Sequence, residues 1–183
     1  MQIKLQTDFM GIAGKKLILI YPGGGILPIR AWPRHYYSLV AGELIKKGYA
    51  VGIVGLATDK ELAAAIRSDC NHPACIDLTG YTRTVIELML IFHFAKLLIT
   101  NDGGPGQFAA LTPIPTIIFF VRETPALYCP LNTRTVVMDV PLACAPCLTA
   151  YNHRNSPCDG DNVCLKLIRV EDVLEKAREV LER

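Results

Sequence analysis

Two glycine-rich turns in this sequence have the residue types of an anion-binding site. The first, Pro22-Gly23-Gly24-Gly25, follows an apolar run that ends at Tyr21 and precedes Arg30. The second, Asp102-Gly103-Gly104-Pro105-Gly106-Gln107, follows an apolar run that ends at Ile99. Glycines let backbone N–H groups approach a ligand, a helix start adds positive potential, and a guanidinium can pair with two oxygens. These groups predict a diphosphate site, and a simple strand-to-helix turn is the alternative interpretation.

Four cysteines, Cys144, Cys147, Cys158 and Cys164, fall in one segment with two, ten and five residues between them. Tetrahedral zinc takes four thiolates, and a C-x-x-C pair supplies two of them from one turn. Structural zinc at these cysteines is therefore one interpretation. Free or disulfide-capable thiols are a second, and redox chemistry at Cys144-Ala145-Pro146-Cys147, which looks like a thioredoxin-type motif, is a third.

The composition places the chain among globular proteins and excludes some partners. The 183 residues are 51% hydrophobic and 20% charged, with a net charge of +2. No block of Lys and Arg gives the basic surface of a nucleic-acid binder, so no nucleic-acid partner is expected. The N-terminus lacks the apolar stretch of a signal peptide, which predicts a cytoplasmic protein. The most apolar run, 85–100, contains Glu87, His93 and Lys96 and is interpreted as core, so no transmembrane segment is expected.

Short apolar runs alternate with segments of helical spacing along the chain. We expect strands at 16–21, 49–54, 75–78, 97–100, 116–120 and near 135–140. Helices are expected after Trp32-Pro33, where Gly48 suits a C-terminal cap, and at 84–94, 107–111 and 170–182. Capping boxes that begin at Thr58 and Thr84 predict the starts of a helix to about residue 67 and of the helix at 84–94. The nearly all-apolar helix at 84–94 is expected to be buried on most sides.

This alternation predicts an α/β fold: a doubly wound, mostly parallel sheet with helices on both faces. We expect one domain over 1–183, which includes a cysteine-rich loop at 141–164 and the C-terminal helix at 170–182. Ligands of such sheets bind at the carboxyl ends of the strands. Both glycine turns leave strands at that edge, so they are expected to face one pocket.

The order of several motifs resembles the C-terminal half of glycosyltransferase family 9, which includes the heptosyltransferases of lipopolysaccharide core assembly. The motifs are Tyr21–Gly25, Arg30-Ala31-Trp32-Pro33, Thr100–Pro105 and Ala109–Thr116. Members of this family pair two Rossmann-like domains in the GT-B arrangement, and the C-terminal domain holds the nucleotide-diphosphate sugar. The resemblance therefore implies a donor-binding, Rossmann-like domain, with Gly23, Gly24, Gly25, Arg30, Asp102, Gly103, Gly104 and Gln107 at the substrate.

The chain departs from the family pattern at three places. Gly103 stands where the family has Ser or Thr, and Gln107 stands where it has His. A glutamine can donate a hydrogen bond to phosphate but cannot carry charge. The family's Phe-Gly-Pro-Thr is replaced by 120–125, which contains Glu123. We interpret Glu123 as an ordinary loop carboxylate, with contact to a sugar hydroxyl as the alternative.

The resemblance implies an inverting, metal-independent transfer to a glycan or lipid-linked acceptor, with no cofactor required for the reaction. The general base is expected in an N-terminal acceptor domain that this chain lacks, so no catalytic residue is assigned here, and the chain alone is expected to be inactive or weakly active. A lipid acceptor would imply peripheral docking at the inner membrane. The competing hypothesis is a non-catalytic module that binds a nucleotide or a protein partner, with the cysteine loop as a structural staple.

Overall fold

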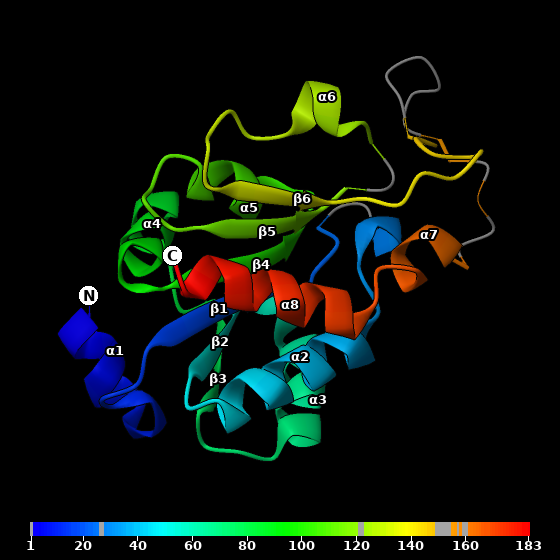
Figure 1. The fold of residues 1–183 in the computed structure, drawn as a ribbon. Coiled ribbons are helices and arrows are strands. Elements are labelled where there is room, and N and C mark those ends of the chain that lie inside the picture. The colour runs from blue at the N-terminus through cyan, green and yellow to red at the C-terminus, as the bar shows by residue number, and fades with distance from the viewer. Residues whose placement is uncertain (1, 26–27, 121–122, 149–154, 157, 159–160) are drawn as a thin grey trace.

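The computed structural model describes residues 2–25, 28–120, 123–148, 155–156, 158 and 161–183. Its centre is a six-stranded sheet with the order β3-β2-β1-β4-β5-β6, in which every paired strand is parallel to its neighbour (Figure 1). The strands are β1 Leu17–Tyr21, β2 Ala50–Gly55, β3 Cys75–Thr79, β4 Leu97–Asn101, β5 Thr116–Phe119 and β6 Thr135–Met138. The strand order reverses between β1 and β4, which places a topological switch point there.

The central strands are continuous apolar runs because both of their faces are covered. Every residue of β1 and β4 is buried, and Ile20 of β1 lies opposite Ile99 of β4. Strands buried on both faces show unbroken apolar runs instead of alternation. The predicted doubly wound parallel sheet is therefore confirmed.

The helices divide between the two faces of the sheet. Their bounds are α1 Gln2–Asp8, α2 Arg34–Lys46, α3 Lys60–Cys70, α4 Val85–Phe94, α5 Gly104–Ala109, α6 Pro125–Tyr128, α7 Val163–Lys166 and α8 Val170–Leu181, with 3-10 turns η1 Met10–Ile12, η2 Pro28–Arg30 and η3 Ala57–Asp59. Helix α8 packs against α2 and crosses β4 and β5, whereas α4 contacts α5, which packs on the same two strands. Figure 1 shows α8 across one face of the sheet, whereas α4 and α5 lie behind the sheet.

Three predictions about helices need correction. Helix α4 is not buried on most sides, because Val85, Ile86 and Leu90 are 43%, 71% and 43% exposed. Helix α5 begins at Gly104, three residues before the predicted start. The box predicted to begin at Thr58 is shifted by two residues, to Leu56: the Asp59 carboxylate accepts a hydrogen bond from the Leu56 N–H at 2.8 Å, and α3 begins only after it.

An aromatic cluster fixes the chain segment between the first glycine turn and α2. The Trp32 ring is 1% exposed, and its centroid lies 4.8 Å from that of Phe119 and 5.1 Å from that of Tyr37. The Trp32 indole also donates to the Ile168 carbonyl at 3.0 Å. These contacts hold the segment that contains Arg30 against the end of β5. None of the helices in the described part of the chain is long and apolar enough to cross a membrane.

Candidate functional site

The carboxyl edge of the sheet brings the two glycine turns together, as the sequence predicts. Tyr21 at the end of β1 lies directly opposite Thr100 of β4. The first turn leaves after Tyr21, and the second leaves one residue after Thr100. This is the switch point of the sheet, where ligands of parallel α/β proteins bind.

A buried amide, Asn101, ties both turns to one point. Its Nδ2 donates to the carbonyls of Pro22 at 3.1 Å and Gly23 at 2.9 Å. Its Oδ1 accepts from the Trp32 N–H at 2.9 Å and the Tyr37 hydroxyl at 3.1 Å. Asn101 is fully buried, so these bonds replace all of its contacts with water. Asn101 was not among the site residues predicted from the sequence. Its position as a polar residue at the end of a buried apolar strand is the feature that could have indicated its role.

The first turn folds back over the Tyr21 ring. A Cβ at Gly23 would lie 3.1 Å from the ring and hydroxyl of Tyr21, and Gly25 has a φ of +60°, so glycine suits both positions. Burial raises the pKa of Tyr21, the Asp59 carboxylate raises it further, and a hydrogen bond with the Gly25 backbone opposes them. Asp59 was not among the predicted site residues; its carboxylate accepts a hydrogen bond from the Leu56 N–H, just beyond the end of β2.

The glycines of the second turn have different roles. Gly103 has an extended φ of 167°, and a Cβ there would meet no atom within 4 Å. A Cβ at Gly106 would lie 2.7 Å from Cδ1 of Ile118. Gly106 therefore allows α5 to pack on β5, whereas Gly103 leaves open space at the mouth of the turn. Asp102 is 9% exposed, and its N–H donates to the Phe119 carbonyl at 3.2 Å.

The two remaining predicted donors both have partners within the protein. Arg30 forms an ion pair with Glu123, Nη2 to Oε2 at 2.9 Å, and the two side chains are 14% and 4% exposed. The interpretation of Glu123 as an ordinary loop carboxylate is therefore wrong. Gln107 is exposed, and its Nε2 donates to the Tyr128 carbonyl at 2.7 Å, which connects α5 to α6.

A cavity of about 540 Å³ opens beside the second turn at this edge of the sheet. It lies between the end of β1 and the segments that follow β2, β3 and β4, and its lining is mainly apolar. Its lining includes Tyr21, Leu56, Val85, Gly104 and Phe108. Gly23, Gly24, Gly25 and Arg30 do not line it, so the predicted pocket shared by both turns is formed by the second turn and by the strand end before the first. A concave, largely apolar cavity of this size with a glycine turn at one end can take a flat base and lead from it to a phosphate group.

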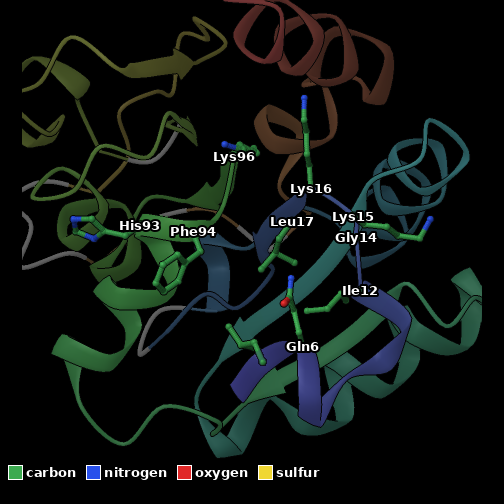
Figure 2. A pocket seen from close by; sticks show the side chains of 10 residues that line it. Gln6, Ile12, Gly14, Lys15, Lys16, Leu17, His93, Phe94 and Lys96 are labelled. Atoms are coloured by element: carbon green, nitrogen blue, oxygen red, sulfur yellow. The ribbon is translucent and has the colours of Figure 1, made fainter. Parts of the chain in front are cut away.

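A second hollow, of about 420 Å³, lies at the opposite edge of the sheet (Figure 2). Lys15, Lys16, Lys96 and His93 line it, and its described lining contains no carboxylate. Figure 2 shows Lys15 and Lys16 extending to different sides of the hollow, with His93 on a third side. These basic side chains do not converge on one point, and the hollow lies at the amino ends of β1 and β4, so it is not the site that the glycine turns form.

All four cysteines of the predicted site are among the described residues, although 149–154, 157 and 159–160 of the same loop are not. Cys147 and Cys164 are buried, whereas Cys144 is exposed. The Ser156 hydroxyl donates to the Cys147 sulfur at 3.2 Å and accepts from the Cys158 N–H at 3.1 Å. In the described residues, no group of three or more His, Cys, Asp or Glu side chains is arranged to hold a metal. Zinc at these cysteines stays a prediction.

Comparison with known proteins matches residues 2–156 to the model of glycosyltransferase family 9 (heptosyltransferase). Lipopolysaccharide heptosyltransferase 2 of Salmonella typhimurium is 26% identical over 181 residues, which are 96% of this chain and 49% of that protein. Lipooligosaccharide heptosyltransferase 2 of Haemophilus influenzae is 29% identical over 136 residues, 73% of this chain and 38% of that protein.

The structure of E. coli ADP-heptose lps heptosyltransferase II superimposes with a TM-score of 0.81 at 23% identity, over 98% of this chain and 50% of that one. This likeness supports the fold, and the present chain spans about half the length of its relatives or less. The family match covers most of the chain, from the first described helix through the glycine turns into the cysteine segment. The chain therefore belongs to glycosyltransferase family 9, the heptosyltransferase family.

Proposed function

We propose that this chain binds the nucleotide-diphosphate sugar of a glycosyltransferase that acts in the synthesis of lipopolysaccharide or another cell-envelope polysaccharide. The observation that supports this most directly is the 540 Å³ cavity, which opens beside Gly104 at the switch point of the sheet. The relatives that match most of the chain are heptosyltransferases of lipopolysaccharide or lipooligosaccharide. The cavity, the glycine turns and the family therefore all favour a nucleotide-diphosphate sugar as the ligand.

The base of the nucleotide would occupy the apolar part of the cavity, between Leu56 and Phe108. Asp59 follows β2, the place where an acidic residue holds ribose hydroxyls in related α/β folds. The diphosphate would lie between the two glycine turns, where backbone N–H groups and Arg30 can neutralise it. The sugar would then extend beyond Arg30, toward the acceptor.

The transfer itself would invert the anomeric carbon without a metal ion. An acceptor hydroxyl attacks that carbon while the nucleoside diphosphate leaves with the bonding electron pair. Backbone N–H groups near Gly24 and Gly104, together with Arg30, can stabilise the charge that develops on the leaving oxygen. The proton of the acceptor hydroxyl would go to a general base outside this chain. We therefore propose that a second, acceptor-binding domain completes the enzyme, and that docking at the inner membrane brings it to a lipid-linked acceptor.

Calorimetric titration of the chain with ADP-, GDP- and UDP-sugars tests this proposal. One of the three is expected to bind with a dissociation constant in the micromolar to millimolar range typical of enzyme substrates. Substitution of Val85 by Lys, which places a long charged side chain on the lining of the cavity, should abolish that binding. Lack of binding by all three nucleotides at millimolar concentration would overturn the donor-binding function.

A non-catalytic module with the same fold is the second candidate, and a specific observation favours it. Two groups expected at the diphosphate, Arg30 and Gln107, contact Glu123 and the Tyr128 carbonyl within the chain. In this case the cysteine segment would act as a structural staple. A transfer assay with the chain joined to an acceptor domain separates the candidates, because a module of this kind binds without supporting transfer.

We also propose that the four cysteines hold a structural zinc ion. Cys147 and Cys164 are buried, and the Ser156 hydroxyl links the Cys147 sulfur to the Cys158 N–H. Metal analysis of protein purified without chelator should find one zinc per chain, and Cys147→Ser should lose it. A zinc content near zero would favour free thiols.

Reductase activity that Cys144→Ser abolishes would instead favour redox chemistry at these cysteines. The described residues 144–148 contain none of the helix that follows a thioredoxin motif.

A further inference from the structure

The ion pair between Arg30 and Glu123 is more deeply buried than a surface ion pair and joins segments far apart in the sequence. Glu123 is 4% exposed and Arg30 is 14% exposed, at an Nη2 to Oε2 distance of 2.9 Å. Removal of two charges from water costs several kcal/mol per ion, and an apolar pair of similar volume is often equally stable. Stability alone therefore does not explain this buried ion pair, and a role in positioning one of its two side chains is the alternative.

The backbone beside Arg30 is held close to the first glycine turn. Arg30 ends η2, two residues before Trp32, whose N–H is held by the side chain of Asn101. The same amide holds the Gly23 carbonyl of the first glycine turn. Arg30 is therefore fixed close to the turn at which we place the diphosphate. Its backbone is held from the Asn101 side, and its guanidinium is held by Glu123.

The guanidinium keeps unused hydrogen-bond donors while it is paired with Glu123. An arginine has five N–H groups, and the ion pair engages Nη2. Its Nε is buried and donates to no acceptor among the described residues. A buried donor without a partner is costly unless a ligand supplies the acceptor. A phosphate oxygen would satisfy it.

We infer that Glu123 is a positioning residue for the donor diphosphate. It holds the Arg30 guanidinium in one orientation, so that the Nε edge remains directed to a phosphate oxygen. This inference rests on the proposed donor-binding function and adds to it a residue that the family pattern does not supply. The segment 120–125 of this chain stands where the family has Phe-Gly-Pro-Thr, a pattern without a carboxylate.

The test compares ADP with adenosine as probes, because only ADP carries the phosphates that Arg30 would contact. With the 183-residue chain, Glu123→Ala should weaken ADP binding about tenfold and change adenosine binding less than twofold in calorimetric titration. Glu123→Gln keeps a hydrogen-bond acceptor and should bind ADP within about threefold of the unchanged chain. In an Arg30→Ala background, Glu123→Ala should change ADP affinity less than twofold, since the residue acts through Arg30.

Asp69→Ala is the matched control, because Asp69 also pairs with an arginine across a long sequence separation, at 2.6 Å from Arg34. Asp69→Ala should leave the affinities for ADP and for adenosine unchanged. An equal loss of ADP and adenosine binding in Glu123→Ala would show a purely structural role and overturn the inference, as would unchanged ADP binding. If the unchanged chain binds neither ADP nor a GDP- or UDP-sugar, the donor-binding proposal is overturned and this inference with it; if it binds a GDP- or UDP-sugar and not ADP, the same comparison is made with that nucleotide and its nucleoside.

Discussion

At the residue scale, the site depends on Asn101 more than on any glycine. We predict that Asn101→Leu, which is similar in volume, lowers the free energy of unfolding by about 2–4 kcal/mol, because it leaves buried carbonyls and N–H groups without partners. Denaturant unfolding measures this loss. Asn132→Ala is the control: its Oδ1 accepts two hydrogen bonds at 2.9 Å, but in a partly exposed turn. A loss below about 1 kcal/mol for Asn101→Leu would contradict this role.

Gly103 offers a gain of function at the residue scale. Because its backbone is extended and the space around it is open, Gly103→Thr should change stability by less than about 0.5 kcal/mol. The hydroxyl restores the family's residue and should strengthen binding of ADP several-fold by one added hydrogen bond. Gly106→Ala is the contrasting variant, expected to cost about 1–3 kcal/mol because its Cβ meets Ile118. Weaker binding by Gly103→Thr would show that the diphosphate lies elsewhere.

Single residues were predictable from the sequence only where local patterns determine them. The glycine turns and the Trp32 segment could be found because glycine content and strand ends are local signals. The ion pair of Arg30 and Glu123 could not, since its partners lie 93 positions apart and meet only when β5 places the second beside η2. Gln107 shows the same limit, because its contact with Tyr128 depends on α6, a short helix that the sequence did not predict.

At the element scale, the sheet was predictable because buried parallel strands are continuous apolar runs. The structure contains all six predicted strands, with ends shifted by at most two residues. Helix starts were less accurate. The Thr84 cap is confirmed by its hydrogen bond from the Glu87 N–H at 3.2 Å, but α5 starts earlier than periodicity indicates, because its first residues are glycine and proline. The exposure of α4 was missed because an apolar sequence does not say which neighbours cover it.

Asp69 connects α3 to α2, and this contact should make stability depend on pH. Its carboxylate accepts from the Ser38 hydroxyl at 2.7 Å and pairs with Arg34. The Ser38 hydrogen bond, and then Arg34, lower the pKa of Asp69 in the folded state. The stabilisation is therefore present above the pKa of the unfolded chain, about 4, and is lost as pH falls through the lower folded pKa.

We predict that Asp69→Asn lowers the midpoint of thermal unfolding at pH 7. The difference in midpoint between the variant and the unchanged chain, the gap, should narrow as pH falls from about 4 toward 2. Thermal unfolding followed by circular dichroism across this range measures the gap. Ser38→Ala should produce a similar pattern, because it removes the first cause of the lowered pKa. A gap that stays constant with pH would mean that Asp69 stabilises the helices by packing alone.

At the scale of the whole molecule, the two edges of the sheet differ in chemistry. The carboxyl edge has glycine turns, a largely apolar cavity and an arginine held by Glu123, whereas the amino edge has exposed lysines around the hollow of Figure 2. In the proposed function, the acceptor reaches the sugar at the carboxyl edge. An acceptor-binding domain would therefore face the exposed start of α4 and the second glycine turn, where Ile86 is 71% exposed.

This arrangement predicts that the chain binds the donor but does not transfer it. With ADP-heptose and a lipopolysaccharide acceptor, ADP release by the 183-residue chain should stay at the uncatalysed level, because the proposed general base belongs to the acceptor-binding domain. The full-length heptosyltransferase 2 of Salmonella typhimurium, about half of which aligns with this chain, is the positive control. Donor binding measured in parallel distinguishes a folded, donor-competent chain from a misfolded one. Transfer at a rate near that of the control would mean that the acceptor hydroxyl is activated by this chain itself, and Asp102, at the mouth of the second turn, would be the first carboxylate to replace.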